Sequence, residues 1–282
     1  MMYLLLLAAD ALFALQFLFT RKYRALEGDD LHAALISMIY ASLIKVVILL
    51  VTGGFRVEFS LFSCGLALIH AALFMASTYA SLKSLATANL SVYSIFMMLG
   101  SMILPFSFGI LFLREPLTAG KVGCVLFILI ALMLTLEKGG SKKGAYKYYF
   151  AVFFLNGMAG VTSTYHQSRP ELAVNSNSFM VFSSAWALVL PLCYYLLKYR
   201  KFPQASAKTL LNRGGYALCN GVGNLLLMIA LAVLPASVQF PIVTGGTMVF
   251  SALVGLCLKE KLTRKKALSL LAAVIATVLV IL

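Results

Sequence analysis

Three ionisable side chains stand inside long apolar runs of this chain, namely Asp10, Lys45 and His70. Such groups are costly in an apolar surrounding, so they tend to face the inside of a helix bundle and to mark proton or ligand pathways. Asp10 suits proton coupling, or it hydrogen-bonds a neighbouring helix. His70 could carry a proton or contact a ligand, or it is a satisfied core histidine. Lys45 has a stem long enough to snorkel to an interface, which is how we interpret it.

Amides, hydroxyls and phenols supply the other polar groups in these runs. Asn220 and Asn224 are four residues apart and therefore share one helix face. Their amides could bind polar ligand groups or hold helices together. The candidate substrate-binding or coupling residues of the whole chain are Asp10, His70, Tyr79, Asn89, Tyr93, Asn156, Tyr165, Asn220, Asn224 and Gln239.

The sequence offers little for covalent or metal chemistry. The three histidines stand far apart, without an H-E-x-x-H arrangement, and the five cysteines are scattered, without a C-x-x-C pair. A phosphate-binding G-x-x-x-x-G-K loop is also missing. We therefore expect no catalytic residue, no metal and no cofactor, and a protein that is not an enzyme.

Composition identifies the surroundings of the chain. Soluble domains are about 45–50% apolar and about 25% charged, whereas 62% of these 282 residues are hydrophobic and 11% are charged. The mean hydropathy is +0.96. One soluble core could not bury so much apolar surface, so the chain is predicted to be an integral membrane protein.

Apolar runs separated by short polar links are the main pattern of the sequence. Each is long enough to cross a hydrocarbon layer of about 30 Å as a helix, and none has the alternation of a membrane strand. The first lacks a basic leader, so we interpret it as a span and not as a signal peptide. The ten runs cover residues 2–20, 32–52, 61–82, 89–113, 120–136, 146–165, 178–197, 214–233, 237–258 and 265–282.

The net charge is +14, and the lysines and arginines are concentrated in alternate links between the apolar runs. Eighteen of the 23 lysines and arginines lie in links 1, 3, 5, 7 and 9, four lie in the even-numbered links, and Lys45 lies in a span. The positive-inside rule therefore puts the odd links in the cytoplasm and both termini outside. The basic charge would contact anionic membrane lipids, and nucleic acid is not an expected partner. We expect a multi-pass protein of the cell (plasma) membrane.

One charged link occurs twice. "LREPLT" at residues 113–118 and "LKEKLT" at 258–263 align at an offset of 145 residues, and the runs around them align as well. Near the N-terminus, Asp10 faces Asn156 at an offset of 146. The chain is thus predicted to contain two copies of a five-span unit, residues 1–137 and 138–282.

Five is an odd number, so two such units in tandem cross the membrane in opposite senses. Inverted repeats of this kind are the architecture of secondary transporters, with a site between the halves. The alternative is a duplication without transport. The predicted fold is an all-α polytopic membrane protein, with ten transmembrane helices arranged as two inverted five-helix repeats.

The repeated link also carries two carboxyl groups, Glu115 and Glu260, between a span and the next one. There a carboxylate can accept hydrogen bonds from the free N–H groups at the start of a helix. Thr118 and Thr263 are expected to N-cap the fifth and tenth spans. We interpret both glutamates as structural hinges, with a gate or proton site as the alternative.

The motifs "FLREPLT" and "CLKEKLT", with the short links "SLATAN" and "LPAS", carry a family resemblance. The chain resembles the drug/metabolite transporter superfamily, specifically its ten-span members with two EamA repeats, over essentially its whole length. The resemblance implies that spans 1, 3, 4, 6, 8 and 9 surround a central cavity and that spans 5 and 10 are peripheral. It also implies cytoplasmic termini, opposite to the charge bias, and we follow the charges.

The expected function is secondary transport by alternating access, coupled to protons. Clustered cations for a multiply anionic substrate are not evident, which favours a small neutral, zwitterionic or cationic metabolite, amino acid-like or aromatic. A flippase or exporter of a lipid or lipophilic compound is the alternative within transport. A membrane-embedded enzyme and a passive channel are alternatives of other classes. One chain contains both halves, so a monomer or a homodimer is expected.

Overall fold

A computed structural model describes residues 2–28, 30–87, 90–135, 146–258 and 263–281. These ranges are almost entirely helical and contain no strand. Within them the helices are α1 (Met2–Glu27), α2 (Leu31–Thr52), α3 (Leu61–Thr87), α4 (Leu90–Phe112), α5 (Ala119–Leu134), α6 (Tyr146–Gln167), α7 (Ser176–Tyr199), α8 (Ala207–Leu231), α9 (Ala236–Cys257) and α10 (Arg264–Ile281).

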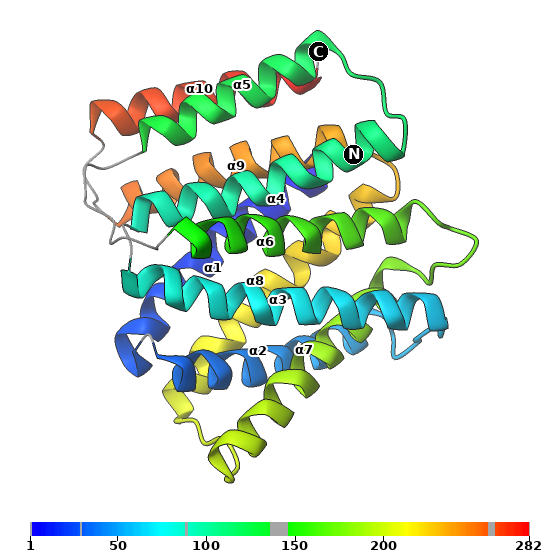
Figure 1. Ribbon diagram of the computed structural model, residues 1–282, viewed down its shortest axis with the longest axis vertical. Coiled ribbons are helices and arrows are strands. Elements are labelled where there is room, and N and C mark those ends of the chain that lie inside the picture. Colours follow the sequence, from blue (N-terminus) through cyan, green and yellow to red (C-terminus); the bar gives the residue numbers. More distant parts are fainter. Residues whose placement is uncertain (1, 29, 88–89, 136–145, 259–262, 282) are drawn as a thin grey trace.

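Successive helices run in alternating directions through one bundle (Figure 1). Odd-numbered helices finish at one end, which we call the odd end. Even-numbered helices finish at the opposite end, the even end, where α1 begins. The position of a residue along its helix therefore shows how far it lies from the odd end and from the even end.

Side-chain caps fix where several helices begin. Asp30 accepts from the backbone N–H of Ala33 at the start of α2. Thr118 accepts from the N–H of Lys121 at the start of α5, and Thr263 accepts from the N–H of Lys266 at the start of α10. Such hydrogen bonds satisfy N–H groups that have no partner within the helix. The predicted threonine caps of the fifth and tenth spans are thus confirmed.

Length and composition make this a membrane-embedded helical protein. In the described ranges, the helices long and apolar enough to cross a membrane are α1, α2, α3, α4, α7, α8 and α9. α5 is a shorter apolar helix of 16 residues, below the ~20 residues that a span commonly has. That all ten helices cross stays a prediction.

α1 and α6 each have two main packing partners. α1 packs against α8 and α9, and α6 packs against α3 and α4. α2 packs against α7 and α8. α5 and α10 lie side by side at one edge (Figure 1), and the fifth and tenth spans are the ones expected at the periphery.

Two glycines allow α4 and α6 to approach closely. A Cβ atom at Gly100 would lie 2.1 Å from the backbone oxygen of Phe153, and one at Gly157 would lie 2.4 Å from the backbone oxygen of Gly100. A larger side chain at either position would push the helices apart. Contact through small residues is typical of helix pairs in membranes.

Candidate functional site

Asp10 is completely buried where α1 faces α9. Its Oδ1 accepts a hydrogen bond from the Thr247 hydroxyl at 3.2 Å, whereas its Oδ2 has no donor among the described residues. A Cβ atom at Gly246 would lie 1.9 Å from Oδ2, so α9 presents bare backbone to the carboxyl group. Buried polar atoms nearly always have a partner, so an oxygen without one marks this carboxyl group as a candidate functional group.

Lys45 points into the bundle from α2 and has an exposed fraction of 9%. Its Nζ donates to the side-chain oxygen of Asn220 on α8 at 3.1 Å. The Asn220 amide in turn donates to the side-chain oxygen of Gln16 on α1 at 2.8 Å. A Cβ atom at Gly221 would lie 3.2 Å from the Lys45 stem. The prediction that Lys45 snorkels to an interface is therefore wrong, because Asn220 and the facing glycine give it an interior place.

Two histidine rings, those of His70 and His166, contact the ring of Phe179. The His70 Nδ1 on α3 is 3.0 Å from the Ser183 hydroxyl on α7, and the His70 ring stacks on Phe179 with centroids 6.1 Å apart. The His166 ring on α6 contacts the same phenylalanine at 4.0 Å between centroids. Its Nε2 is 2.9 Å from the Ser63 hydroxyl on α3. Each histidine is thus hydrogen-bonded to a serine from the other predicted half.

We use the name central polar network for three separate sets of interior hydrogen bonds, which are Asp10 with Thr247, His70 with Ser183, and Asn220 with Lys45 and Gln16. Every hydrogen bond named for it links a residue in 1–137 to a residue in 138–282. In the described part of the chain, no three His, Cys, Asp or Glu side chains gather to hold a metal ion. The network consists of Asp10, Gln16, Lys45, His70, Ser183, Asn220 and Thr247.

Three further predicted amides donate hydrogen bonds to backbone oxygens. Asn156 on α6 donates to the backbone oxygen of Met97 on α4 at 3.0 Å. Asn224 donates to the backbone oxygen of Asn220 at 2.7 Å, one turn earlier on α8. Gln239 on α9 is buried and donates to the Leu227 oxygen at 2.8 Å. The hydrogen bonds of Asn156 and Gln239 join two helices, and that of Asn224 lies within α8. The side-chain oxygen of Gln239 is buried and has no partner among the described residues.

The predicted tyrosines lie apart from the central polar network. Tyr79 is 49% exposed on α3. The Tyr93 hydroxyl donates to the Ser81 hydroxyl at 3.0 Å, between α4 and α3. Tyr165 contacts the ring of Phe62 near the even end. Asn89 lies outside the described residues. The structure therefore does not bring Tyr79, Tyr93 or Tyr165 together with Asp10.

Glu115 caps a helix of the other predicted half. Its carboxylate accepts from the backbone N–H groups of Ala236 and Ser237, both at 2.9 Å, and from the Ser237 hydroxyl. The N-cap residue of α9 makes no side-chain hydrogen bond of its own. We expected the carboxylate at the start of the following helix, but that helix is α5 and Thr118 caps it. Glu260 lies outside the described residues.

Other polar contacts at the even end join α7 to the link between α2 and α3. The Asn175 N–H donates to the Glu58 carboxylate at 3.0 Å. Hydrogen bonds from the Asn175 backbone and side chain hold the pKa of that exposed carboxyl below its usual range. Glu115, Thr164 and Gln167 line a cleft of about 240 Å³ at this end.

Arg213 is a buried cation that sequence reasoning assigned to a link. It lies in α8 with an exposed fraction of 2%. The guanidinium stacks on Tyr23 at 4.0 Å and on Tyr216 at 4.9 Å, measured to the ring centroids. It donates to the Ser37 hydroxyl at 2.8 Å and to the Phe19 backbone oxygen at 2.9 Å. Arg213 thus ties α8 to α1 and α2 near the odd end.

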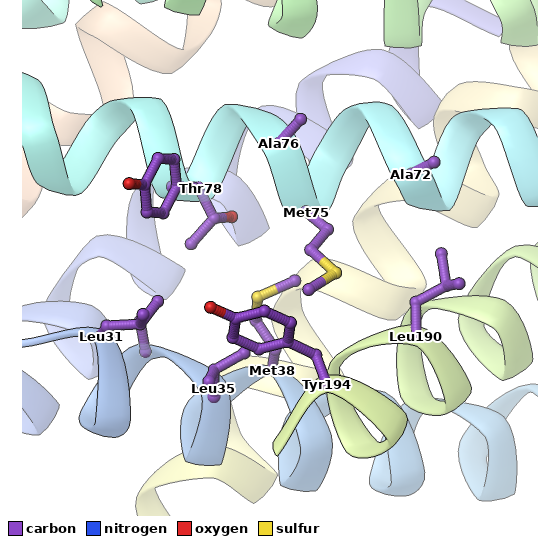
Figure 2. A pocket seen from close by; sticks show the side chains of 11 residues that line it. Leu31, Leu35, Met38, Ala72, Met75, Ala76, Thr78, Leu190 and Tyr194 are labelled. Atoms are coloured by element: carbon purple, nitrogen blue, oxygen red, sulfur yellow. The ribbon is translucent and has the colours of Figure 1, made fainter. Parts of the chain in front are cut away.

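An apolar groove of about 470 Å³ opens between α2, α3 and α7 (Figure 2). No member of the central polar network lines it. Its lining includes Leu35, Met38, Ala72, Met75, Tyr79 and Tyr194. Of the predicted site residues, the groove contains Tyr79 alone.

Comparison with known proteins bears on the fold. No family model matches the chain, and no curated protein does either. A solved structure described only as "Crystal structure of protein" matches 99% of this chain and 95% of its own, with a TM-score of 0.77 and 14% sequence identity. At that identity the similarity extends to the fold alone.

Proposed function

We propose that the chain is a secondary transporter whose two inverted halves, residues 1–137 and 138–282, enclose a substrate site and open it to either side of the membrane in turn. The observation that carries this proposal is the central polar network. Its hydrogen bonds run between the predicted halves, so relative movement of the halves would break and remake them. Polar groups in a membrane interior are costly and are characteristic of transport pathways.

The helix packing supports an inverted repeat. In an inverted repeat, each helix of the first half corresponds to the helix five positions later. The contact of α1 with α8 then corresponds to that of α6 with α3, and the contact of α1 with α9 corresponds to that of α6 with α4. All four contacts occur. α2 with α7, α4 with α9 and α5 with α10 pair each helix with its own counterpart, as expected beside a two-fold axis.

The interior position of Lys45 narrows the class of substrate that we propose. A positive charge beside Asn220 favours a carboxylate and disfavours a cation. From the sequence we expect Lys45 at an interface and no cluster of inward cations, whereas the interior Lys45 supplies one cation. Of the neutral, zwitterionic and cationic metabolites first considered, we therefore propose a small zwitterionic one, amino acid-like, whose carboxylate binds at Lys45.

Asp10 is the proposed coupling residue. Its carboxyl group is buried at the interface of α1 with α9, and one of its oxygens has no donor among the described residues. Proton uptake would remove the charge, and proton release would restore it. Either event changes how strongly the carboxyl holds Thr247 across the halves, which is a way to link proton movement to the conformational change.

The drug/metabolite transporter superfamily remains the proposed family, on the sequence motifs and the packing symmetry. A lipid flippase has less support, because the groove between α2, α3 and α7 has apolar walls and no member of the central polar network lines it. A lipid headgroup would need a polar path to cross. A proton-coupled carrier in the plasma membrane fits the interior hydrogen bonds better.

A ligand screen followed by a flux assay tests the proposal. The purified full chain is heated with members of a metabolite library, since a ligand in 100-fold excess over its Kd stabilises a protein by about 2.7 kcal/mol. A stabilising zwitterion is then offered, radiolabelled, to vesicles that contain the protein. Saturable counterflow supports a carrier. Unsaturable flux indicates a channel, and a chemically altered product indicates an enzyme.

A further inference from the structure

We propose that the groove between α2, α3 and α7 binds an anionic phospholipid, with an acyl chain in the groove and the phosphate at its odd-end mouth. The proposal is independent of the transported cargo. It rests on the shape of the groove, the apolar character of its walls and the charges at one end.

The groove has the size and chemistry of a lipid-chain site. Its volume of about 470 Å³ lies within the range of about 300–1,000 Å³ that ligand pockets commonly have. Leu35 and Met38 contribute from α2, Met75 and Ala72 from α3, and Leu190 from α7 (Figure 2). The walls can therefore bury a hydrocarbon chain without leaving polar groups unpaired.

The groove has three side-chain hydroxyls. Thr78 donates to the Phe74 backbone oxygen at 2.9 Å, and the other two belong to half-exposed tyrosines, Tyr79 at 49% and Tyr194 at 40%. Each tyrosine lies near the odd end of its helix, and a lysine follows it one helical turn later. Lys83 Nζ is 5.7 Å from the centroid of the Tyr79 ring. Lys198 Nζ is also 5.7 Å from the centroid of the Tyr194 ring.

These contacts bring two ammonium groups near the tyrosines of the groove, and Lys198 Nζ also lies 5.5 Å from the centroid of the Tyr199 ring. Lys83 and Lys198 are exposed, and both stand where α3 and α7 approach the odd end. The phenolic hydroxyls of Tyr79 and Tyr194 can donate to phosphate oxygens, and the lysines supply positive charge. Basic residues of this kind above an apolar surface are typical of binding sites for anionic lipid headgroups. A zwitterionic lipid would place its own cation next to the lysines, so the site favours a net negative headgroup.

Native mass spectrometry of the purified full chain tests this inference. The protein in detergent is mixed with phosphatidylglycerol or phosphatidylcholine of identical acyl chains, and retained lipid is counted. We expect the unmodified chain to retain phosphatidylglycerol preferentially. The double variant K83Q/K198Q should lose about 30-fold in that retention, because each of the two basic residues near a membrane surface contributes about 1 kcal/mol.

Two further variants make the result specific to the groove. K147Q/K208Q removes the same charge from the odd-end helix starts of α6 and α8, and it should retain phosphatidylglycerol normally. Ala76→Phe fills the groove from α3 and should lower retention of both lipids. Equal retention of the two lipids by the unmodified chain would overturn the proposal. So would equal losses in the two double variants, or unchanged retention in Ala76→Phe.

Discussion

The Lys45 side-chain nitrogen donates to the Asn220 side-chain oxygen at 3.1 Å, although 175 residues separate the two in the chain. The same asparagine donates to Gln16, so α1, α2 and α8 meet at one amide. Because Lys45 and Asn220 belong to different predicted halves, their hydrogen bond lies where a substrate between the halves would sit.

Lys45→Gln should weaken ligand binding while the fold persists. Glutamine retains a donor for Asn220 but lacks the positive charge. A charge-assisted hydrogen bond contributes about 1.5–3 kcal/mol, so the affinity for a carboxylate-bearing ligand should fall about 10- to 100-fold. The measurement is the ligand-dependent rise in Tm of the purified protein.

Lys121→Gln is the matched control for that experiment. Lys121 is also buried, but its Nζ donates to the Pro116 backbone oxygen at the start of α5. Its replacement should leave ligand affinity unchanged. Equal losses of affinity in the two variants would contradict the proposal that the ligand carboxylate binds at Lys45.

Glu115→Gln should destabilise the even end of α9. The amide keeps one acceptor but loses the charge that faces the N–H groups of Ala236 and Ser237. Loss of a charged cap costs about 1 kcal/mol, and the Tm should fall by about 2–4 °C. Glu171→Gln is the control, since Glu171 is exposed and lies 3.9 Å from Arg169. A Glu115→Gln protein with the Tm of this control would contradict the cap.

Gly100→Ala should weaken the contact between α4 and α6. The new methyl group would lie 2.1 Å from the Phe153 backbone oxygen, and overpacking of this kind costs about 1–3 kcal/mol. Gly65→Ala on α3 meets no atom within 4 Å and should be neutral or stabilising, because alanine favours helix by about 1 kcal/mol. Thermal unfolding of the two variants compares them directly, and a Gly100→Ala Tm at or above that of Gly65→Ala would refute the close contact.

The charge bias predicts a defined orientation. In a background without native cysteines, Lys201→Cys at the odd end should be protected from a membrane-impermeant maleimide in intact cells. Glu171→Cys at the even end should be labelled. The reverse labelling pattern would place the termini in the cytoplasm, as the family resemblance implies.

The helices were predictable because each apolar run of the sequence has about the length that a helix needs to cross a membrane. The apolar runs of the sequence correspond to α1–α10, and the threonine caps at α5 and α10 follow from the repeated link. Asp10 was predictable as an interior group, since a carboxyl in an apolar run has few other places to go.

Partners across the bundle were not predictable. Glu115 lies next to α5 in sequence, yet it caps α9 after a separation of 121 residues to Ala236. Lys45 and Arg213 can each be a surface or an interior cation by sequence pattern alone. Their long stems reach in either direction, and the side they take depends on facing groups such as Asn220 and Tyr23, which only the packed bundle brings close.

Proton-driven uptake by vesicles that contain the full chain is the most direct test of coupled transport between two halves. The unmodified protein should concentrate the ligand found by the thermal screen when a pH gradient is imposed. Asp10→Asn should lose that accumulation but retain counterflow at equal pH, and Asp30→Asn, which preserves a helix cap, should behave as the unmodified protein. Accumulation by Asp10→Asn at the unmodified rate would contradict the coupling role of Asp10, and the absence of saturable, gradient-driven uptake by the unmodified protein would contradict the transport proposal itself.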